Sequence, residues 1–452
     1  MSISRPGEAA YDAAAQVFNL AAPARPAAAV TARSIVDIRA ALDFAVDNGL
    51  PVRVHTTGHA ASGTRPVDGA VLIRTALAGA VEVDATRRIA RIPAGTRWGA
   101  VVEATAPHGL TAPHGSSPTV GVVGYLLRGG MSFYGRKFGL AVNSVRAVEL
   151  VTADGEHRRV DATNDPELFW ALRGGGGGLG VVTAIEVALF PVAKVITGAA
   201  YWPAAHAEQL LNLWLKWTDD APHEATTSVR VINMPEVDGV PPVLAGRTMF
   251  SVDGAVLSAI EDVTEAQRIA DDLLDPLRAV AEPAMDTWAL TEPPSVLEAH
   301  MDPSDPVPFV GDHMLLGALG EGGAEEFLRV VGPGSDSPLV VAGLRQLGGA
   351  FAVPDPNGGA LSHLDARYSY AGSGVPFGTI TPDALHDHCT KVRAALSTWD
   401  TGRTVPGFVE DVSRPQRHLD ADGIAAVDAV RVRVDPNGLF RADIAPNATA
   451  LY

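Results

Sequence analysis

Cysteine is almost absent from this 452-residue sequence, in which Cys389 is the single example. One cysteine cannot form an internal disulfide, and it cannot supply a cysteine-based zinc site or an iron–sulfur cluster within the chain. We therefore expect no metal centre. Residues 1–30 also lack a charged head followed by an apolar run, so the expected compartment is the cytoplasm.

Basic residues are scarce as well. The sequence has 35 Lys and Arg against 52 Asp and Glu, which gives a formal net charge of -17. Binding to phosphate backbones or to anionic membranes depends on clustered basic side chains. No window reaches the ~18 uninterrupted apolar residues of a membrane-spanning helix. These absences exclude nucleic acid and membrane as expected partners and leave a small molecule.

The sequence does contain the material of a large folded core, because 47% of its residues are hydrophobic and 19% are charged. Its length suggests two or three domains. Helical spacing over 35–45 beside strand-like segments at 51–54 and 70–74 predicts a small α+β unit. A second unit, over about 113–191, contains a hairpin pattern at 145–160 and a buried strand at 181–190.

After residue 191 the pattern changes to a separate sheet covered by helices. Helix-period stretches occur at 205–217, 260–274 and 325–331, and strand-like stretches occur at 227–232, 247–252, 313–317 and 367–370.

Three loops are rich in glycine or small residues: 55–60 (HTTGHA), 115–124 (GSSPTVGVVG) and 173–178 (RGGGGG). Backbone N–H groups in such loops can bind a diphosphate, and glycine lets a flat ring approach the bare backbone. The first loop alone could equally be a simple turn after a strand. The 115–124 loop carries neither a Gly-x-Gly-x-x-Gly pattern that opens a helix after a strand, as in a dinucleotide-binding βαβ unit, nor a Walker lysine.

Taken in order, these loops resemble the FAD-linked oxidases of the vanillyl-alcohol oxidase fold, in the berberine-bridge-enzyme branch, as found in bacteria. The stretches 52–62, 164–183 and 431–441 carry the resemblance, together with lead-in residues that match the family, which are Tyr11, Phe18 and Pro26. It implies an α+β, two-domain FAD-binding fold whose antiparallel substrate-domain sheet is covered by helices. The implied parts are an FAD-binding domain at 1–193, a substrate-binding domain at 194–399, and a C-terminal segment at 400–452 that returns to the FAD domain.

The resemblance also implies the cofactor, FAD, joined covalently through one histidine, His59. Ser117 stands where many relatives have a cysteine that makes a second flavin bond, and serine offers no thiolate, so we expect one bond. The residues that the resemblance places against FAD are His55, Thr56, Thr57, Gly58, His59, Ala60, Ser62, Ser116, Ser117, Thr119, Val120, Gly121, Gly124, Tyr125, Gly129, Gly175, Gly180, Val182 and Phe440.

Some positions depart from the family pattern. Arg128 and Ser132 replace small residues, and Asp443 stands where an asparagine is common. Phe408 occupies the position of a tyrosine that relatives use as the catalytic base, and a phenylalanine ring cannot accept a proton.

The base must then be another group, and we rank Tyr370 first and Glu410 second, with Tyr368 as a further candidate. Tyr368 and Tyr370 share a strand face, and Glu410 lies two positions after Phe408. Each has a structural alternative: an aromatic core pair and a solvated carboxylate. Three more polar side chains of the second sheet could reach the flavin: His313, Arg345 and His363.

The implied reaction is removal of a hydride from an alcohol, amine or activated C–H carbon of a small-molecule substrate, with a bacterial natural product as the expected class. In relatives, the position held here by Val120 gates O2, and valine admits it. An oxidase using O2 is therefore expected. The alternative is a cyclase that keeps the flavoprotein fold for a non-redox step, and the missing tyrosine keeps this alternative open.

Overall fold

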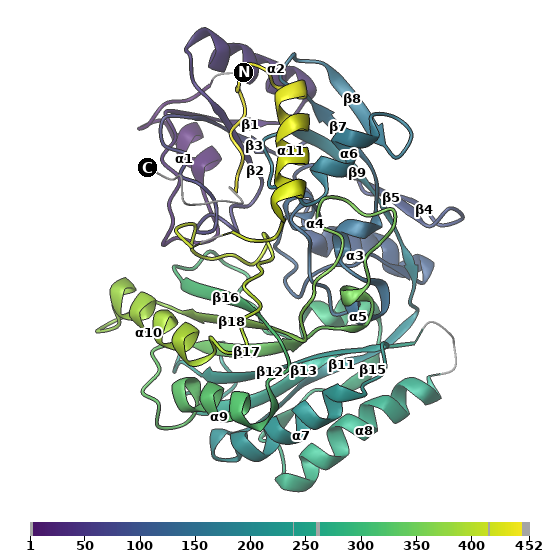
Figure 1. The fold of residues 1–452 in the computed structure, drawn as a ribbon, viewed down its shortest axis with the longest axis vertical. Coiled ribbons are helices and arrows are strands. Elements are labelled where there is room, and N and C mark those ends of the chain that lie inside the picture. The colour runs from purple at the N-terminus through teal and green to yellow at the C-terminus, as the bar shows by residue number, and fades with distance from the viewer. Residues whose placement is uncertain (1–2, 238, 259–262, 415, 445–452) are drawn as a thin grey trace.

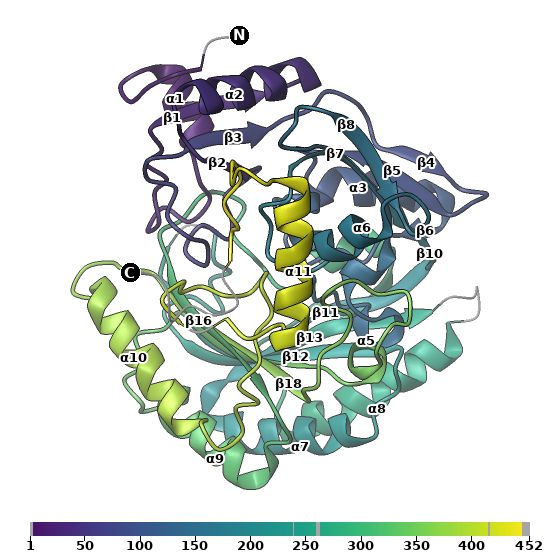
Figure 2. The ribbon, with the colours of Figure 1, turned by 45° about the horizontal axis from the view of Figure 1, so that its top comes forward.

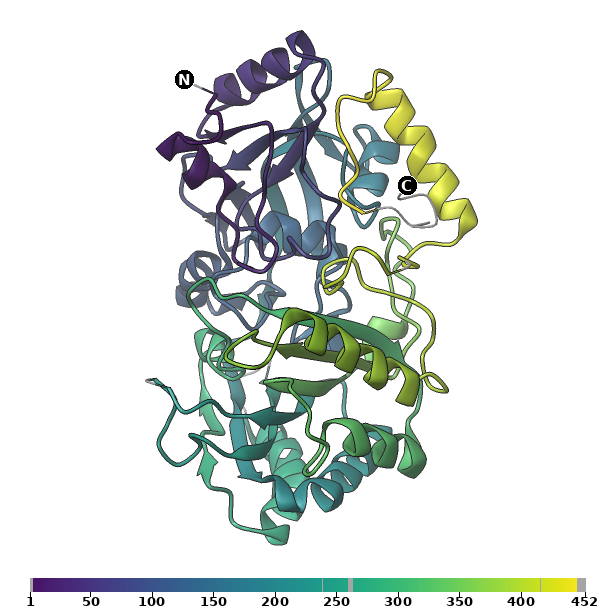
Figure 3. The ribbon, with the colours of Figure 1, turned by 90° about the vertical axis from the view of Figure 1, so that its left-hand side faces the viewer.

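The computed structural model describes residues 3–237, 239–258, 263–414 and 416–444. Helices and strands form two units, an upper and a lower one in the orientation of Figure 1. The upper unit holds two sheets, and the lower unit holds one large sheet with helices on its outer face. Figure 3 shows the two units one above the other from the side.

The first sheet of the upper unit is parallel, in the order β1-β3-β2. Helix α2 packs against it, and the chain enters α2 through a capping box in which Ser34 and Asp37 bond each other's backbone N–H. Gly49, with φ of +63°, follows the end of the helix. The elements are α1 (Ala9–Ala15), β1 (Ala28–Ala32), α2 (Ile35–Asp47), β2 (Val52–His55) and β3 (Val71–Thr75).

The second sheet is antiparallel, in the order β4-β5-β9-β7-β8. The hairpin expected at 145–160 is confirmed as β7 and β8, and the expected buried strand is β9. The strands are β4 (Glu82–Asp84), β5 (Ile89–Pro93), β7 (Val145–Val151), β8 (His157–Asp161) and β9 (Val181–Ala188), with a short pair β6 (Leu110–Thr111) and β10 (Phe190–Pro191). The helices nearby are α3 (Trp98–Thr105), α4 (Val122–Leu127), α5 (Gly135–Phe138) and α6 (Pro166–Leu172).

The end of the described chain lies against the upper unit. Helix α11 (Ala421–Val434) packs on α6 and buries Val427 and Val430 in the same core as the second sheet. Beyond it, the Val52 N–H donates to the Leu439 carbonyl at 2.7 Å, so residues 439–441 run beside β2. Figure 2 shows α11 as the yellow helix across the front of the molecule.

The lower unit is built on an antiparallel sheet in the order β14-β11-β13-β12-β17-β18-β16, with β15 also paired to β11. Helices cover the face of the sheet that points away from the upper unit (Figure 1). The strands are β11 (Lys194–Pro203), β12 (Ala225–Asn233), β13 (Thr248–Ser258), β14 (Met285–Asp286), β15 (Ala289–Thr291), β16 (Val310–Leu316), β17 (Val341–Gln346) and β18 (Tyr368–Gly374). The helices are α7 (Ala207–Asp219), α8 (Thr264–Val280), α9 (Gly320–Val331) and α10 (Pro382–Ala395).

The strongest helical and strand patterns of this unit are confirmed, although α9 begins five residues earlier than expected and residues 259–262 lie outside the described residues. Several elements were not predicted, among them β11, β17, α10 and α11. The β17 sequence, VAGLRQ, is short and carries a glycine and an arginine, and α11 buries only Val427 and Val430 among its side chains. Neither β17 nor α11 shows apolar residues at the regular spacing that identifies a strand or a helix in the sequence.

Arg136, at the start of α5, fixes this segment to the lower sheet. Its side chain is 5% exposed and donates hydrogen bonds to the carbonyl oxygens of Ala221, Ala225 and Leu347. Guanidinium is suited to this task because its donors diverge in a fixed plane. One side chain therefore ties the ends of β12 and β17 to the upper unit.

We predict that Arg136→Met lowers the free energy of unfolding by on the order of 3 kcal/mol, because three buried carbonyls lose their donors. Urea unfolding measures the change. The control is Arg146→Met, whose exposed guanidinium bonds only the nearby Asn143 carbonyl and whose loss should cost less than about 0.5 kcal/mol. Equal effects of the two substitutions would contradict this account.

Candidate functional site

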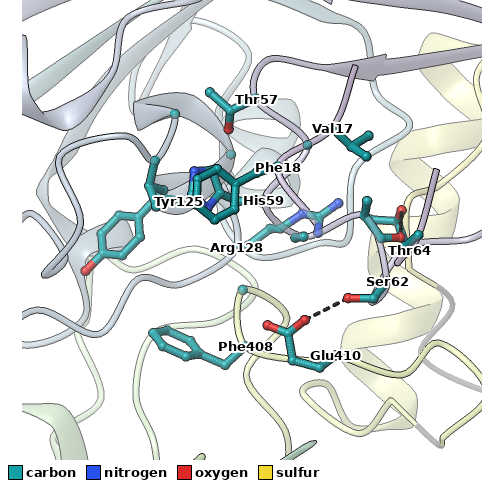
Figure 4. A pocket seen from close by; sticks show the side chains of 18 of the residues that line it. Val17, Phe18, Thr57, His59, Ser62, Thr64, Tyr125, Arg128, Phe408 and Glu410 are labelled. Atoms are coloured by element: carbon teal, nitrogen blue, oxygen red, sulfur yellow. Dashed lines mark hydrogen bonds between the residues drawn. The ribbon is translucent and has the colours of Figure 1, made fainter. Parts of the chain in front are cut away.

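A cavity of about 1330 Å³ lies between the two units. Its walls come from the loop after β2, the 115–131 segment, residues 177–182, the inner face of the lower sheet and residues 407–412. Figure 4 shows part of this lining, with side chains from widely separated segments pointing into one space.

The conformation and packing of the loop after β2 require glycine at two positions, 58 and 63. Gly58 has φ of +69°, and an added Cβ would lie 2.7 Å from Val17. At Gly63 an added Cβ would lie 1.8 Å from the Val409 carbonyl oxygen. These glycines let the loop pack between residue 17 on one side and residue 409 on the other. Among the described residues, no hydrogen bond uses the N–H groups of His59 or Ala60, which leaves them available to a ligand.

His59 lines the cavity with its ring fixed in place. The ring stacks on Phe18 with centroids 3.8 Å apart, and Nε2 lies 3.3 Å from Oγ1 of Thr119. Burial lowers the pKa of His59 to about 4, so the imidazole is neutral at pH 7. Thr119 Oγ1 lies in turn 2.9 Å from Ser117 Oγ. With Nε2 engaged by Thr119, Nδ1 is the ring nitrogen left to react.

A cluster of guanidinium groups surrounds Asp443. Nη2 of Arg128 lies 2.9 Å from one carboxylate oxygen of Asp443, and Nη2 of Arg53 lies 3.2 Å from the other. Buried nitrogens remain without a partner in the described part of the chain: Nε and Nη1 of Arg53, Nη1 of Arg128 and Nε of Arg65. One carboxylate does not neutralise three cations. The cluster is therefore suited to binding an anion with several oxygens.

Glu410 points into the cavity beside Phe408 and accepts a hydrogen bond from Ser62 Oγ at 2.7 Å (Figure 4). Burial raises the pKa of Glu410 to about 7, against the hydrogen bond from Ser62, which lowers it. The charge of Asp312 raises it further. A carboxyl with this pKa exchanges a proton near neutral pH, which suits a general base.

Most of the residues predicted to bind the cofactor line this cavity. They are His55, Thr56, Thr57, Gly58, His59, Ala60, Ser62, Ser116, Ser117, Val120, Gly121, Gly124, Tyr125, Gly180, Val182 and Phe440. Thr119 reaches the site through His59 instead of lining it. Gly124 faces open space, because an added Cβ would meet no atom within 4 Å.

Two of the glycines predicted to bind the cofactor, Gly129 and Gly175, are not among the residues that line the cavity. An added Cβ at Gly175 would lie 2.2 Å from the Ala171 carbonyl oxygen and 3.1 Å from Val427, which places this glycine under α11. At Gly129 the near neighbours are Leu361 and Val405 at 3.1 and 3.3 Å. Both glycines serve close packing away from the cavity.

The structure places the first-ranked base, Tyr370, and also Tyr368 away from the cavity. Strand alternation puts both side chains on the helix-covered face of the lower sheet. Tyr370 is 0% exposed and burial raises its pKa well above the usual value, while Tyr368 Oη lies 2.7 Å from Thr218 Oγ1. Ser369 and Ala371, from the opposite face of β18, line the cavity. Of the three candidate bases, only Glu410 lies in the site.

Among the further polar groups, Arg345 lines the cavity, whereas His313 and His363 are not among its lining residues. His313 lies behind Phe408, with ring centroids 5.8 Å apart. Sequence reasoning missed the roles of Arg53, Arg65 and Arg230 in the lining. The sequence did hold one signal for such a role: Arg53 stands between two apolar residues of the strand β2.

Comparisons with known proteins agree with this geometry. Residues 26–161 match a sequence family described as an FAD binding domain. This part of the chain is thus similar to known FAD binding domains. The match covers the loop after β2 with His59, the 115–131 segment and the hairpin of β7 and β8, so the FAD-binding domain supplies one wall of the cavity.

The whole described fold has solved counterparts. A 6-hydroxy-D-nicotine oxidase from Arthrobacter nicotinovorans superposes with a TM-score of 0.81 at 23% identity, covering 99% of this chain and 97% of that one. A berberine-bridge-enzyme-like protein of Physcomitrella patens gives 0.81 at 19% identity, with the same coverage. The chain thus has the fold of the vanillyl-alcohol oxidase type, and the fold that the resemblance implied is confirmed.

Sequence relatives match over part of their length. An (R)-6-hydroxynicotine oxidase of Paenarthrobacter nicotinovorans is 34% identical over 204 residues, which is 45% of this chain and 44% of the relative. A glucooligosaccharide oxidase of Sarocladium strictum is 34% identical over 190 residues, 41% and 38% of the two chains. The matched regions therefore span less than half of each relative. No helix in the described residues is long and apolar enough to cross a membrane.

The residues present fit FAD. Nε and Nη1 of Arg53, Nε of Arg65 and Nη1 of Arg128 are buried without a partner within the described chain, and a diphosphate would supply one. The free N–H groups of the loop after β2 are further donors.

Glu410 should make stability depend on pH. Its pKa is raised from 4.5 to about 7, so the folded protein holds the proton more tightly than the unfolded chain. The stabilisation from this group is complete below pH 4.5 and is lost as the pH rises through 7. We predict that the parent loses roughly 1–3 kcal/mol more than Glu410→Gln between pH 5 and pH 8, measured by urea unfolding. Glu208→Gln, an exposed change on α7, should follow the parent, and parallel pH curves for parent and Glu410→Gln would contradict the shift.

Proposed function

We propose that this protein is an FAD-dependent oxidase that removes a hydride from an alcohol or amine carbon of a small-molecule substrate. The observation that carries the proposal is the single cavity in which a neutral His59, an unsatisfied arginine cluster and a carboxyl with a pKa near 7 converge. The printed names of the relatives, oxidases of hydroxynicotine and of glucooligosaccharides, support an amine or an alcohol as the reacting group.

Within this proposal the upper unit holds the cofactor. Arg53, Arg65 and Arg128 supply donors for the diphosphate, and the loop after β2 supplies backbone N–H groups. Bound FAD would supply the hydride acceptor, with O2 as the proposed final oxidant. Val120 lines the cavity with its carbonyl fixed by the Trp98 N–H at 3.0 Å, which keeps the small side chain at this wall.

His59 is the proposed point of covalent attachment. Its low pKa keeps the imidazole neutral and therefore nucleophilic, and the contact from Thr119 to Nε2 leaves Nδ1 free. We propose attachment through Nδ1. A solved glucooligosaccharide oxidase is described in its title as carrying a 6-S-cysteinyl, 8α-N1-histidyl FAD. Ser117 in this chain has no thiol, so the second of those bonds is not proposed here.

Glu410 is the proposed general base. It lies on the cavity wall beside Phe408, where the family pattern has a tyrosine, and its raised pKa allows it to take a substrate O–H or N–H proton near neutral pH. The Ser62 hydroxyl, which donates to Oε2, fixes the direction of the carboxyl group. This assignment weakens the case for a cyclase, because that alternative rested on the lack of a base at residue 408.

The tether is tested by denaturing the protein. We predict that acid-precipitated parent protein keeps its yellow colour and that mass spectrometry finds one flavin-bearing peptide, which contains His59. His59→Ala keeps the arginine and backbone donors for the diphosphate, so it should still bind FAD. Because the tether is missing, that FAD should be released on denaturation. Thr119→Val is the matched control, since it keeps the imidazole and removes the contacts of Thr119 Oγ1 with His59 Nε2 and with Ser117 Oγ, so it should keep the covalent flavin. Colourless parent pellets, or an adduct on Ser117, would contradict the assignment.

The reaction and its base are tested together by anaerobic mixing with a panel of alcohols and amines. We predict that the visible flavin band bleaches, and that the rate of bleaching rises with pH around 7 as Glu410 loses its proton. Glu410→Gln should reduce that rate by roughly 10²–10⁴-fold and abolish the pH dependence. Ser62→Ala removes the bond that lowers the pKa of Glu410, so its rate profile should move to higher pH.

The outcomes separate the candidate functions. Substrate conversion without any bleaching would support the cyclase and refute the oxidase. Bleaching at the parent rate in Glu410→Gln would keep the oxidase and refute the assigned base.

A further inference from the structure

Arg345 is the centre of a second polar cluster on the opposite wall of the cavity. It lies on β17, and the register places it between Ser228 of β12 and Ser369 of β18. Its Nη1 donates to the Met131 carbonyl at 3.0 Å, its Nε donates to Ser228 Oγ at 3.3 Å, and its guanidinium lies 4.2 Å from the centre of the Phe133 ring. These contacts hold the group in one orientation within the wall.

The charge of Arg345 is not neutralised by the protein. Within the described residues no carboxylate oxygen lies within 4.0 Å of its guanidinium nitrogens. The nearby carboxylates are otherwise engaged: Asp253 pairs with Arg230 at 2.7 Å and with His300 at 3.0 Å, and Asp302 accepts from Ser116 at 2.6 Å. Burial lowers the pKa of Arg345, which shows the cost of holding an unpaired cation there.

The hydroxyl groups around Arg345 are placed to donate. Ser228 Oγ accepts from Arg345, so its own hydrogen is free to point elsewhere. His313 Nδ1 lies 2.9 Å from the Tyr370 carbonyl and must carry hydrogen, so Ser369 Oγ, 3.4 Å away, can only accept from it. The Ser369 hydrogen is then also free. Tyr125 Oη is buried without a partner among the described residues, and it too lines the cavity.

A fixed guanidinium with free hydroxyl donors on either side matches the two oxygens of a carboxylate. Arg230, two positions from Ser228 on the same strand, already has its carboxylate in Asp253, which identifies Arg345 as the group that lacks one. The arginines that suit the diphosphate belong to the upper unit, whereas Arg345 belongs to the lower sheet. We propose that the substrate carries a carboxylate, or an equivalent anionic group, that pairs with Arg345 between Ser228 and Ser369.

This inference rests on the proposed function, in that it places an oxidase substrate in the cavity, but it can be tested without turnover. The probes are benzoate and benzamide, which share size and shape and differ in charge. Binding to the protein as purified is measured by calorimetry and by the change in the visible flavin spectrum. We expect benzoate to bind roughly ten- to hundredfold more tightly than benzamide, the range of a charge-assisted hydrogen-bonded pair.

Substitutions assign that preference to Arg345. Arg345→Gln should bring the benzoate-to-benzamide ratio near one, and Arg345→Lys should keep much of it because the charge remains. Arg367→Gln is the matched control: it removes an arginine that directly precedes β18, is not among the cavity-lining residues and bonds Asp219 at the end of α7. It should keep the full ratio.

Three results would overturn the proposal. These are equal affinities in the parent, a preference that survives in Arg345→Gln, and a preference lost equally in Arg367→Gln. If Arg345 instead served the flavin ring, Arg345→Gln would lower the flavin reduction potential and leave the benzoate preference unchanged. Protein purified without FAD would refute the proposed function alone, since calorimetry still reports the ratio.

Discussion

Asp443 is the residue on which the floor of the cavity depends. Its carboxylate joins Arg53 of β2 to Arg128 at the end of α4, and its backbone bonds the Arg65 N–H and the Gly176 carbonyl, each at 2.9 Å. Four segments that are distant in sequence are thereby fixed around one carboxylate. Because three cations face this one anion, the floor keeps an excess of positive charge and is suited to an anionic cofactor.

Arg128 and Asp443 could be singled out from the sequence, but the ion pair between them could not be predicted from it. Arg128 and Asp443 were both recognisable as departures from the family pattern, yet nothing in either position indicated that they contact each other. Their contact spans 315 positions of the chain, and such a contact depends on the tertiary fold and not on local periodicity. The two departures thus compensate each other, because Arg128 in the glycine-rich segment pairs with the carboxylate of Asp443, at a position where the family commonly has an asparagine amide.

The same limit explains which site residues were predictable. Glycine content and strand ends located the loop after β2, because backbone conformation is a local property. Strand alternation correctly put Tyr368 and Tyr370 on one face, but it could not say which face the helices cover. Helix α7 covers Tyr368, and α9 and α10 cover Tyr370. Glu410 was the weaker candidate in the sequence because its pKa is set by burial and by Ser62, 348 positions away.

The charge of the interior runs opposite to that of the whole chain. The whole chain carries a net charge of -17. The floor of the cavity nevertheless holds the unsatisfied arginines near Asp443, and its opposite wall holds Arg345. At physiological salt the field of exposed charges falls off within about 8 Å, so the outer charge gives an anionic substrate little long-range attraction. Recognition must then depend on direct contact inside the cavity. There a desolvated guanidinium distinguishes a carboxylate from a neutral group far more strongly than a solvent-exposed guanidinium could. Selectivity in this cavity is therefore a property of buried pairing and not of surface steering.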